Sequence, residues 1–397
     1  MKKYPFFILT ALALTGCSYN EPVASVSDQN SDNFSQYQDI INKANWYYNQ
    51  LKGNTRASSP KVQNVELLQN HYTRSEGDSV ETPIYYIVNY ENEAGFVMLG
   101  GNETAEPLAA ISEEGNLSFN DTINNPGLAS YISSLYIPGI RPEPVIPYDS
   151  LRNESSLIIN IDPLLHPNVR KWGKGLPLSR SLPTFGKWNI PTKVNATQLA
   201  LLMAMTYFEW PNQETEYNFD WNGIKESTSH SHIGTILKLI GSNDFGLKVN
   251  YDINESTADP NNITAAADLM HYDCVSDGRT LENLSMNSKD SLRNLLPFII
   301  WGENYSNGNK KVSTWVIDGV CTVLEIPGNS LKYYLHCVWG DYGIGNGYFL
   351  MSNLDYIGGY RDFKDATDGT DPRYVDSPEV PEYTNNSYLY SLVPDYH

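Results

Sequence analysis

Residues 194–211, with the sequence VNATQLALLMAMTYFEWP, form the stretch that decides the fold class of this chain. The run is strongly apolar and predicts a buried helix over 192–209, which ends at Trp210-Pro211 because proline restricts the residue before it. Two more helices are expected, at 233–240 and 265–270. From Leu295 the pattern changes to strands, at 297–301, 314–318, 333–339 and 348–351. Helices followed by antiparallel strands predict an α+β arrangement.

Residues 32–140 predict a small domain of antiparallel strands with a helix at each end. Apolar side chains recur at helical spacing from Phe34 to Leu51, and Gly53 ends that helix. Strands are then expected at 83–90, 96–99, 108–111 and 117–119, followed by a helix over 126–136. Beyond this domain the sequence predicts an exposed, proline-containing linker over 141–176, a second domain over 177–363 and an acidic tail over 364–397.

Residues 1–17 predict an export signal that is not part of the fold. Two lysines precede an apolar run over 5–14, which is too short to span a bilayer. The run leads into Leu14-Thr15-Gly16-Cys17, which resembles a bacterial lipobox in which Cys17 is lipidated. We therefore expect a polar tether over 18–31 and a lipid anchor in the outer membrane, on the periplasmic or the surface side of the cell envelope. A soluble exported protein cut near Gly16 is the alternative.

The net charge argues against one class of partner. The 397 residues carry 27 Lys and Arg against 46 Asp and Glu, a formal net charge of −19, and no basic block interrupts the acidic sequence. Because a protein that binds a nucleic acid must neutralise its phosphate charges with basic residues, nucleic-acid binding is disfavoured. A mean hydropathy of −0.41 also argues against a multi-span membrane protein.

The cysteines and histidines do not have the spacing of a metal site or a disulfide framework. Cys274, Cys321 and Cys337 are expected to be buried thiols, although a pair between Cys321 and Cys337 is left open. His230 and His232 have no carboxylate at ligand spacing and are expected in a solvated loop. No metal or other cofactor is expected.

Four segments, in their order and spacing, resemble the streptopain family of papain-like cysteine peptidases. Residues 87–98, IVNYENEAGFVM, look like the hairpin of the inhibitory propeptide of that family, and Lys187-Trp188-Asn189 looks like the segment that begins the mature enzyme. Residues 194–211 look like the helix that carries the nucleophile. Residues 315–319, WVIDG, and 336–340, HCVWG, look like the strands that carry the catalytic base and its orienting partner. The resemblance implies a propeptide-like domain over 32–140 and a papain-like domain over 177–363.

The resemblance also indicates which catalytic groups are missing. A cysteine peptidase needs a thiolate at a helix start, an imidazole within reach and a donor for the oxyanion. The family positions for these three groups are occupied here by Ala196, Ser313 and Ile190. The position of the group that orients the base is Val338, so that only Trp339 of the family site is kept. We therefore predict a member without peptidase activity.

A papain-like domain without its catalytic groups would still have the substrate cleft, which can bind a ligand. We expect it to be lined by Trp188, Trp315, Trp339 and His336 and to accept a peptide or protein ligand. His336 is also the candidate replacement for the missing base, although a half-buried histidine beside Tyr334 is the simpler interpretation. Two other functions are kept open. One is an active cysteine-type peptidase that uses one of the three remaining thiols, and the other is a carbohydrate-binding or scaffold lipoprotein rich in Tyr and Trp.

Overall fold

The computed structural model describes residues 24–26, 31–53, 60–73, 79–101, 105–119, 126–135, 155–211, 217–276, 297–306, 309–326, 330–351, 354 and 387–394. Its helices are α1 Gln38–Leu51, α2 Pro126–Ser134, α3 Pro167–Arg170, α4 Ala196–Phe208, α5 Trp221–Lys225, α6 His230–Ile240 and α7 Ile263–Asp268. Its strands are β1 Ala24–Val26, β2 Val62–Thr73, β3 Ser79–Tyr90, β4 Phe96–Gly100, β5 Leu108–Ser112, β6 Ser155–Ile161, β7 Thr184–Phe185, β8 Ile190–Pro191, β9 Tyr272–Ser276, β10 Phe298–Ser306, β11 Asn309–Ile326, β12 Ser330–Val338, β13 Gly347–Leu350 and β14 Ser387–Pro394. These elements confirm the predicted α+β class.

One twelve-stranded sheet runs through both predicted domains, in the order β1-β2-β3-β4-β5-β13-β12-β11-β10-β14-β9, with β6 also paired to β11. The two halves of the chain meet where β5 pairs antiparallel with β13, through Ile111 opposite Tyr348 and Ala110 opposite Phe349. The propeptide-like strands therefore extend the sheet of the second half of the chain.

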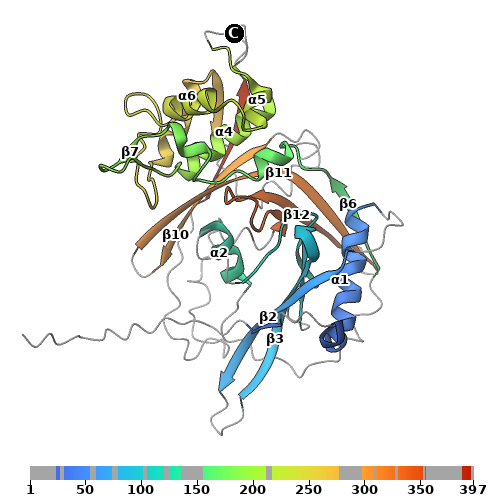
Figure 1. Cartoon of the computed structure of the whole chain (residues 1–397). Coiled ribbons are helices and arrows are strands. Elements are labelled where there is room, and N and C mark those ends of the chain that lie inside the picture. Colours follow the sequence, from blue (N-terminus) through green and yellow to red (C-terminus); the bar gives the residue numbers. More distant parts are fainter. Residues whose placement is uncertain are drawn as a thin grey trace, which may run out of the picture.

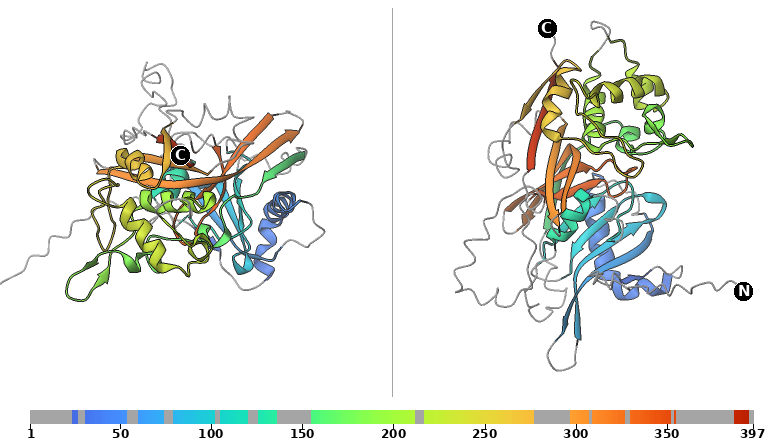
Figure 2. Two further views of the ribbon diagram at one scale, coloured as in Figure 1. Left: turned by 90° about the horizontal axis from the view of Figure 1, so that it is seen from above. Right: turned by 90° about the vertical axis from the view of Figure 1, so that its left-hand side faces the viewer.

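Helices cover the sheet on both sides. Figure 1 shows α4, α5 and α6 on one side of β10 and β11 and α2 on the other, and the right-hand view of Figure 2 shows the same separation. Helix α1 lies beside β6. Three buried apolar clusters follow from this arrangement, one under α4–α7, one under α2 and one under α1. The clusters under α1 and α2 contain side chains from both halves of the chain, so the halves share their cores.

The local predictions for the N-terminal half are largely confirmed. Helix α1 begins at Gln38, after a 3-10 turn over Ser31–Tyr37, and it buries Ile40, Ala44 and Tyr48 against the sheet. The expected hairpin forms between β3 and β4, and Gly95 adopts a φ of +113° in its turn, where a Cβ would stand 2.1 Å from the Ser112 carbonyl oxygen. The strand expected over 117–119 is irregular, and β2 was not predicted.

Three segments that were expected to lack regular structure contain strands. Residues 155–161 of the expected linker form β6, which pairs with the C-terminal part of β11. Residues 387–394 of the expected tail form β14, which lies between β10 and β9 inside the sheet. Residues 24–26 of the expected tether form β1, which lies at one edge of the sheet and pairs with β2. The expected signal, Cys17 and the proline-containing start of the linker lie outside the described residues.

The apolar stretch that decided the fold class forms α4, which begins at Ala196 rather than at residue 192. Residues 197–206 of this helix are all buried, between the sheet and the smaller helices. His230 and His232 lie in α6 rather than in a loop, and His232 Nδ1 accepts a hydrogen bond from the Asp220 backbone N–H at 2.9 Å. None of the helices in the described ranges has both the length and the apolar character needed to cross a bilayer.

Candidate functional site

The start of α4 is built as a helix terminus that would suit a nucleophile. The Asn195 side chain accepts hydrogen bonds from the backbone N–H groups of Thr197 and Gln198, and the Gln198 side chain accepts one from the Asn195 N–H. This capping box fixes Ala196 as the first residue of the helix. A thiol at such a position would have its pKa lowered by the helix dipole, whereas the methyl group of Ala196 has no chemistry to activate.

A hydrogen bond between two buried hydroxyl groups joins α4 to β11 beside this position. Thr197 Oγ1 lies 2.8 Å from Thr314 Oγ1, and both side chains are buried. Thr197 follows Ala196 in the chain and Thr314 follows Ser313, so the bond ties together the two segments where the family resemblance places nucleophile and base. The sequence did not predict that these two threonines meet.

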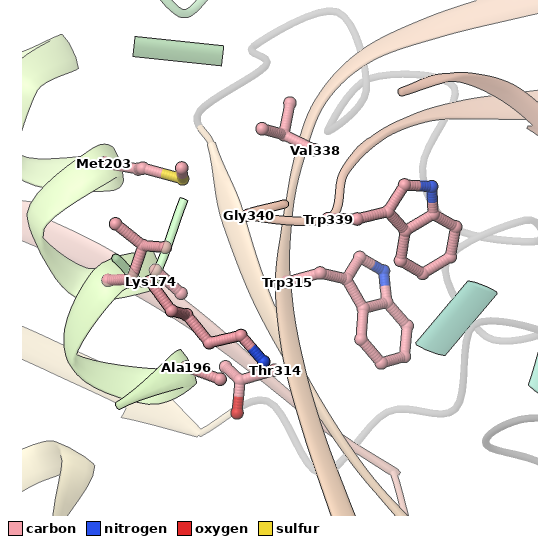
Figure 3. Close-up of a pocket in the computed structure, with 10 residues that line it drawn as sticks. Lys174, Ala196, Met203, Thr314, Trp315, Val338, Trp339 and Gly340 are labelled. Atoms are coloured by element: carbon pink, nitrogen blue, oxygen red, sulfur yellow. The ribbon is translucent and has the colours of Figure 1, made fainter. Parts of the chain in front are cut away.

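The space next to Ala196 is small. A cavity of about 10 Å³, roughly the room of one water molecule, is lined by Lys174, Ala196, Leu199, Ala200, Met203, Thr314, Trp315, Val338, Trp339 and Gly340. Figure 3 shows Ala196 and Met203 on one side of the strand that carries Thr314, and the indole rings of Trp315 and Trp339 projecting to the other side. The structure therefore brings Ala196, Val338, Trp315 and Trp339 together, but around a cavity too small for a peptide side chain.

Helix α2 covers the far side of the two tryptophans. Trp315 and Trp339 are buried, with ring centroids 5.3 Å apart, and they share an apolar cluster with Leu128 and Tyr131 of α2. A Cβ on Gly127 would stand 2.8 Å from the Trp339 ring and 2.9 Å from Ser313 Oγ. Only a glycine allows α2 to approach this closely. The sequence predicts a helix that starts at Pro126-Gly127. It does not show which side chains this helix packs against.

The structure places Trp188 and Ile190 elsewhere. They lie on the hairpin of β7 and β8, which is joined by the pairs Thr184–Pro191 and Phe185–Ile190. The Trp188 side chain is 77% exposed and that of Ile190 is 44% exposed, and neither lines the cavity. Trp188 is thus separate from the surface formed by Trp315 and Trp339, and no oxyanion donor is present at Ile190.

His336 faces neither the cavity nor solvent. Its side chain is buried, its Nδ1 lies 2.5 Å from Asp318 Oδ1, and its ring packs edge-on against Tyr348 at 4.9 Å between centroids. Asp318 also accepts a hydrogen bond from the Leu165 N–H at 3.1 Å. The reason for this orientation is a β-bulge, because Ile317 pairs with Cys337 and Gly319 pairs with His336, leaving Asp318 as the extra residue.

The three described cysteines are free thiols that are poorly suited to nucleophilic attack. Burial raises the pKa of the Cys274 thiol to about 11 and that of the Cys321 thiol to about 12. Burial also raises the pKa of Cys337 well above its usual value, with a further increase from the nearby Asp318 charge. Cys321 and Cys337 belong to different apolar clusters and form no disulfide with each other. The described residues contain no group of three His, Cys, Asp or Glu side chains that could hold a metal ion.

Comparisons with known proteins agree with the resemblance seen in the sequence. Residues 35–136 match the family described as Spi protease inhibitor, within the predicted propeptide-like domain. A fragment of prointerpain A from Prevotella intermedia aligns with 82% of this chain and 98% of its own, at 16% identity and a TM-score of 0.48. The active wild-type interpain A cysteine protease of the same organism aligns over 48% of this chain and 85% of its own, at 16% identity and a TM-score of 0.37. No curated protein sequence matches the chain. The chain is therefore similar to the Spi protease inhibitor family over residues 35–136.

Proposed function

We propose that this chain is a catalytically inactive relative of a propeptide-bearing cysteine peptidase and that it acts by binding a peptide or protein. The observation that carries the proposal is Ala196, which occupies the first position of the capped helix α4. The loss is not confined to this residue, since Ser313 and Ile190 stand at the family positions of the base and the oxyanion donor. Each described thiol lies elsewhere and has a raised pKa.

The closed arrangement around Trp315 and Trp339 limits where a ligand binds. In this structure α2 covers the two rings, and the cavity on the α4 side has room for about one water molecule. A peptide that reached the tryptophans would have to displace α2. Binding by the closed form must therefore use a surface outside this site.

A peptidase assay on the full chain tests the loss of catalysis. We expect no cleavage of casein or of a fluorogenic peptide library, because no thiolate and imidazole are paired within the described residues. We also expect iodoacetamide at pH 7 to modify Cys274, Cys321 and Cys337 slowly, as their raised pKa values leave little thiolate. Thiol-sensitive turnover, or rapid modification of one of these three cysteines as mapped by mass spectrometry, would support the alternative of an active cysteine-type peptidase.

The lipobox-like sequence supports a second part of the proposal, namely that the protein is exported and held at the outer membrane of the cell envelope by a lipid on Cys17. We expect the wild-type protein to partition into the membrane and detergent phase, and the Cys17→Ser variant to lose that partitioning. The control is Cys274→Ser, which removes a thiol of the folded body and should leave partitioning unchanged. Equal partitioning of wild type and Cys17→Ser would contradict the anchor.

A further inference from the structure

The charges of this acidic protein are distributed unevenly along the chain. No Asp or Glu occurs between Asp162 and Glu209, although the chain has 46 of them and a net charge of −19. The same interval holds six basic residues, namely Arg170, Lys171, Lys174, Arg180, Lys187 and Lys193. A local region of positive charge therefore stands in a strongly negative molecule.

Backbone contacts gather this interval into one compact unit. The Val194 N–H donates to the Lys174 carbonyl at 2.7 Å, and the Thr192 N–H donates to the Pro183 carbonyl at 3.2 Å. Lys193 Nζ lies 3.3 Å from the point where a Cβ on Gly175 would stand. Cations from the two ends of the segment are thus brought to the same part of the molecule, at the base of the β7–β8 hairpin.

Within the described residues, most of these cations have no carboxylate partner. Arg170 pairs with Glu114 at 3.3 Å, but the other five basic residues make no ion pair in the part of the chain that the structure describes. Lys171, Arg180 and Lys187 are also exposed. Their charge is therefore available to a ligand from solution.

Large apolar side chains stand exposed among these charges. Figure 1 shows β7 projecting from the group of helices α4–α6. Phe185 is 58% exposed and Trp188 is 77% exposed, while Lys187 Nζ lies 5.1 Å from the centre of the Trp188 ring. Exposed aromatic residues beside cations are the side chains that contribute most to protein interfaces.

We propose that Arg180, Phe185, Lys187 and Trp188 form a docking surface, the basic hairpin surface, for an acidic segment of a partner protein. Carboxylates of the partner meet the unpaired cations, and an apolar or aromatic side chain of the same segment packs on Trp188 and Phe185. Charge complementarity selects this occupant, since the rest of the chain repels polyanions. The inference deepens the proposed binding function by naming its surface and ligand chemistry, and it does not depend on the loss of catalysis.

Binding of fluorescein-labelled poly-L-glutamate and of a glutamate–tyrosine copolymer to the full chain tests this surface. We expect saturable binding that weakens with salt, since a net charge of −19 opposes adventitious binding of a polyanion. The double variant Arg180→Glu with Lys187→Glu should weaken both ligands by about tenfold or more. Trp188→Ala should weaken the copolymer more than poly-L-glutamate, because only the copolymer carries a ring to pack on the indole.

Two matched controls separate this surface from general effects of charge and exposure. The double variant Lys238→Glu with Lys248→Glu makes the same charge change at two exposed positions away from the hairpin, and Phe245→Ala removes an aromatic ring that is 69% exposed elsewhere. Both should bind like the wild type.

The proposal is overturned if the wild type does not bind, or if the controls weaken binding as much as the hairpin variants. It is overturned as well if phosphatidylglycerol vesicles or heparin bind this surface and the glutamate polymers do not. It is also overturned if the hairpin variants abolish a concentration-dependent self-association, which would make a second copy the occupant. Peptidase activity does not enter any of these outcomes.

Discussion

Replacing Asp318 with alanine is expected to lower the free energy of unfolding by about 2–6 kcal/mol, because each of two buried donors left without an acceptor costs about 1–3 kcal/mol. Asp318 is fully buried, and its two carboxylate oxygens contact His336 Nδ1 and the Leu165 N–H. Its carbonyl oxygen also accepts from the Leu164 N–H at 2.8 Å. The side chain therefore links β11, β12 and the segment that follows β6, and its loss leaves two buried donors without an acceptor.

Chemical denaturation of the full chain measures this effect. Asp318→Asn should cost less than Asp318→Ala, because the amide oxygen still accepts one hydrogen bond in a side chain of the same shape. Asp244→Ala, at an exposed position, serves as the control and should change stability by less than about 0.5 kcal/mol. An Asp318→Ala variant as stable as this control would show that the pair with His336 contributes nothing to the fold.

Cutting the chain between residues 141 and 147 is expected to leave the two halves bound to each other in native buffer. A propeptide can be released on cleavage only if the rest of the protein stays folded without it. Here β5 is hydrogen-bonded to β13, and the cluster under α2 packs Leu128 and Tyr131 against Trp339. Separation would break the sheet and expose the apolar side chains of both halves, at about 25 cal/mol for each Å² exposed.

A cleavage site for a specific protease, inserted within 141–147, allows the chain to be cut there and the association of the two fragments to be measured. After complete cleavage we expect a single peak in size-exclusion chromatography at the position of the intact chain, and two separate fragments only in denaturant. The control is the same treatment of the chain without the inserted site. Separation of the fragments at micromolar concentration in native buffer would show that the N-terminal half is a removable propeptide.

The sequence predicted those elements whose signals are local. The apolar run predicted the buried helix α4, although its start was placed at residue 192 and the capping box of Asn195 and Gln198 sets it at Ala196. The β3–β4 hairpin was predicted from the turn that ends at Gly95. For the same reason the absence of a cysteine at residue 196 was visible without any structure. Capping, turns and residue identities depend on neighbours in the chain, and these are what a single sequence displays.

Side-chain direction in the sheet was less predictable. His336 was expected either to line the cleft or to be half-buried beside Tyr334, yet it is fully buried and contacts Asp318, the residue that the bulge adds to β11. A bulge inserts one residue into one strand of a pair, so its effect on the facing strand cannot be read from either segment separately.

The α+β class, the buried helix over the apolar run and the residues at positions 190, 196 and 313 could be read from the sequence. Three features required the folded chain: β6 and β14 join the sheet, α2 closes over Trp339 through Gly127, and Trp188 stands apart on an exposed hairpin. They were not predictable because the partners are far apart along the chain. Strand β6 pairs with residues about 160 positions later, from Val320 opposite Ile161 to Ile326 opposite Ser155, and such pairings depend on which apolar surfaces remain to be buried once the local elements have formed.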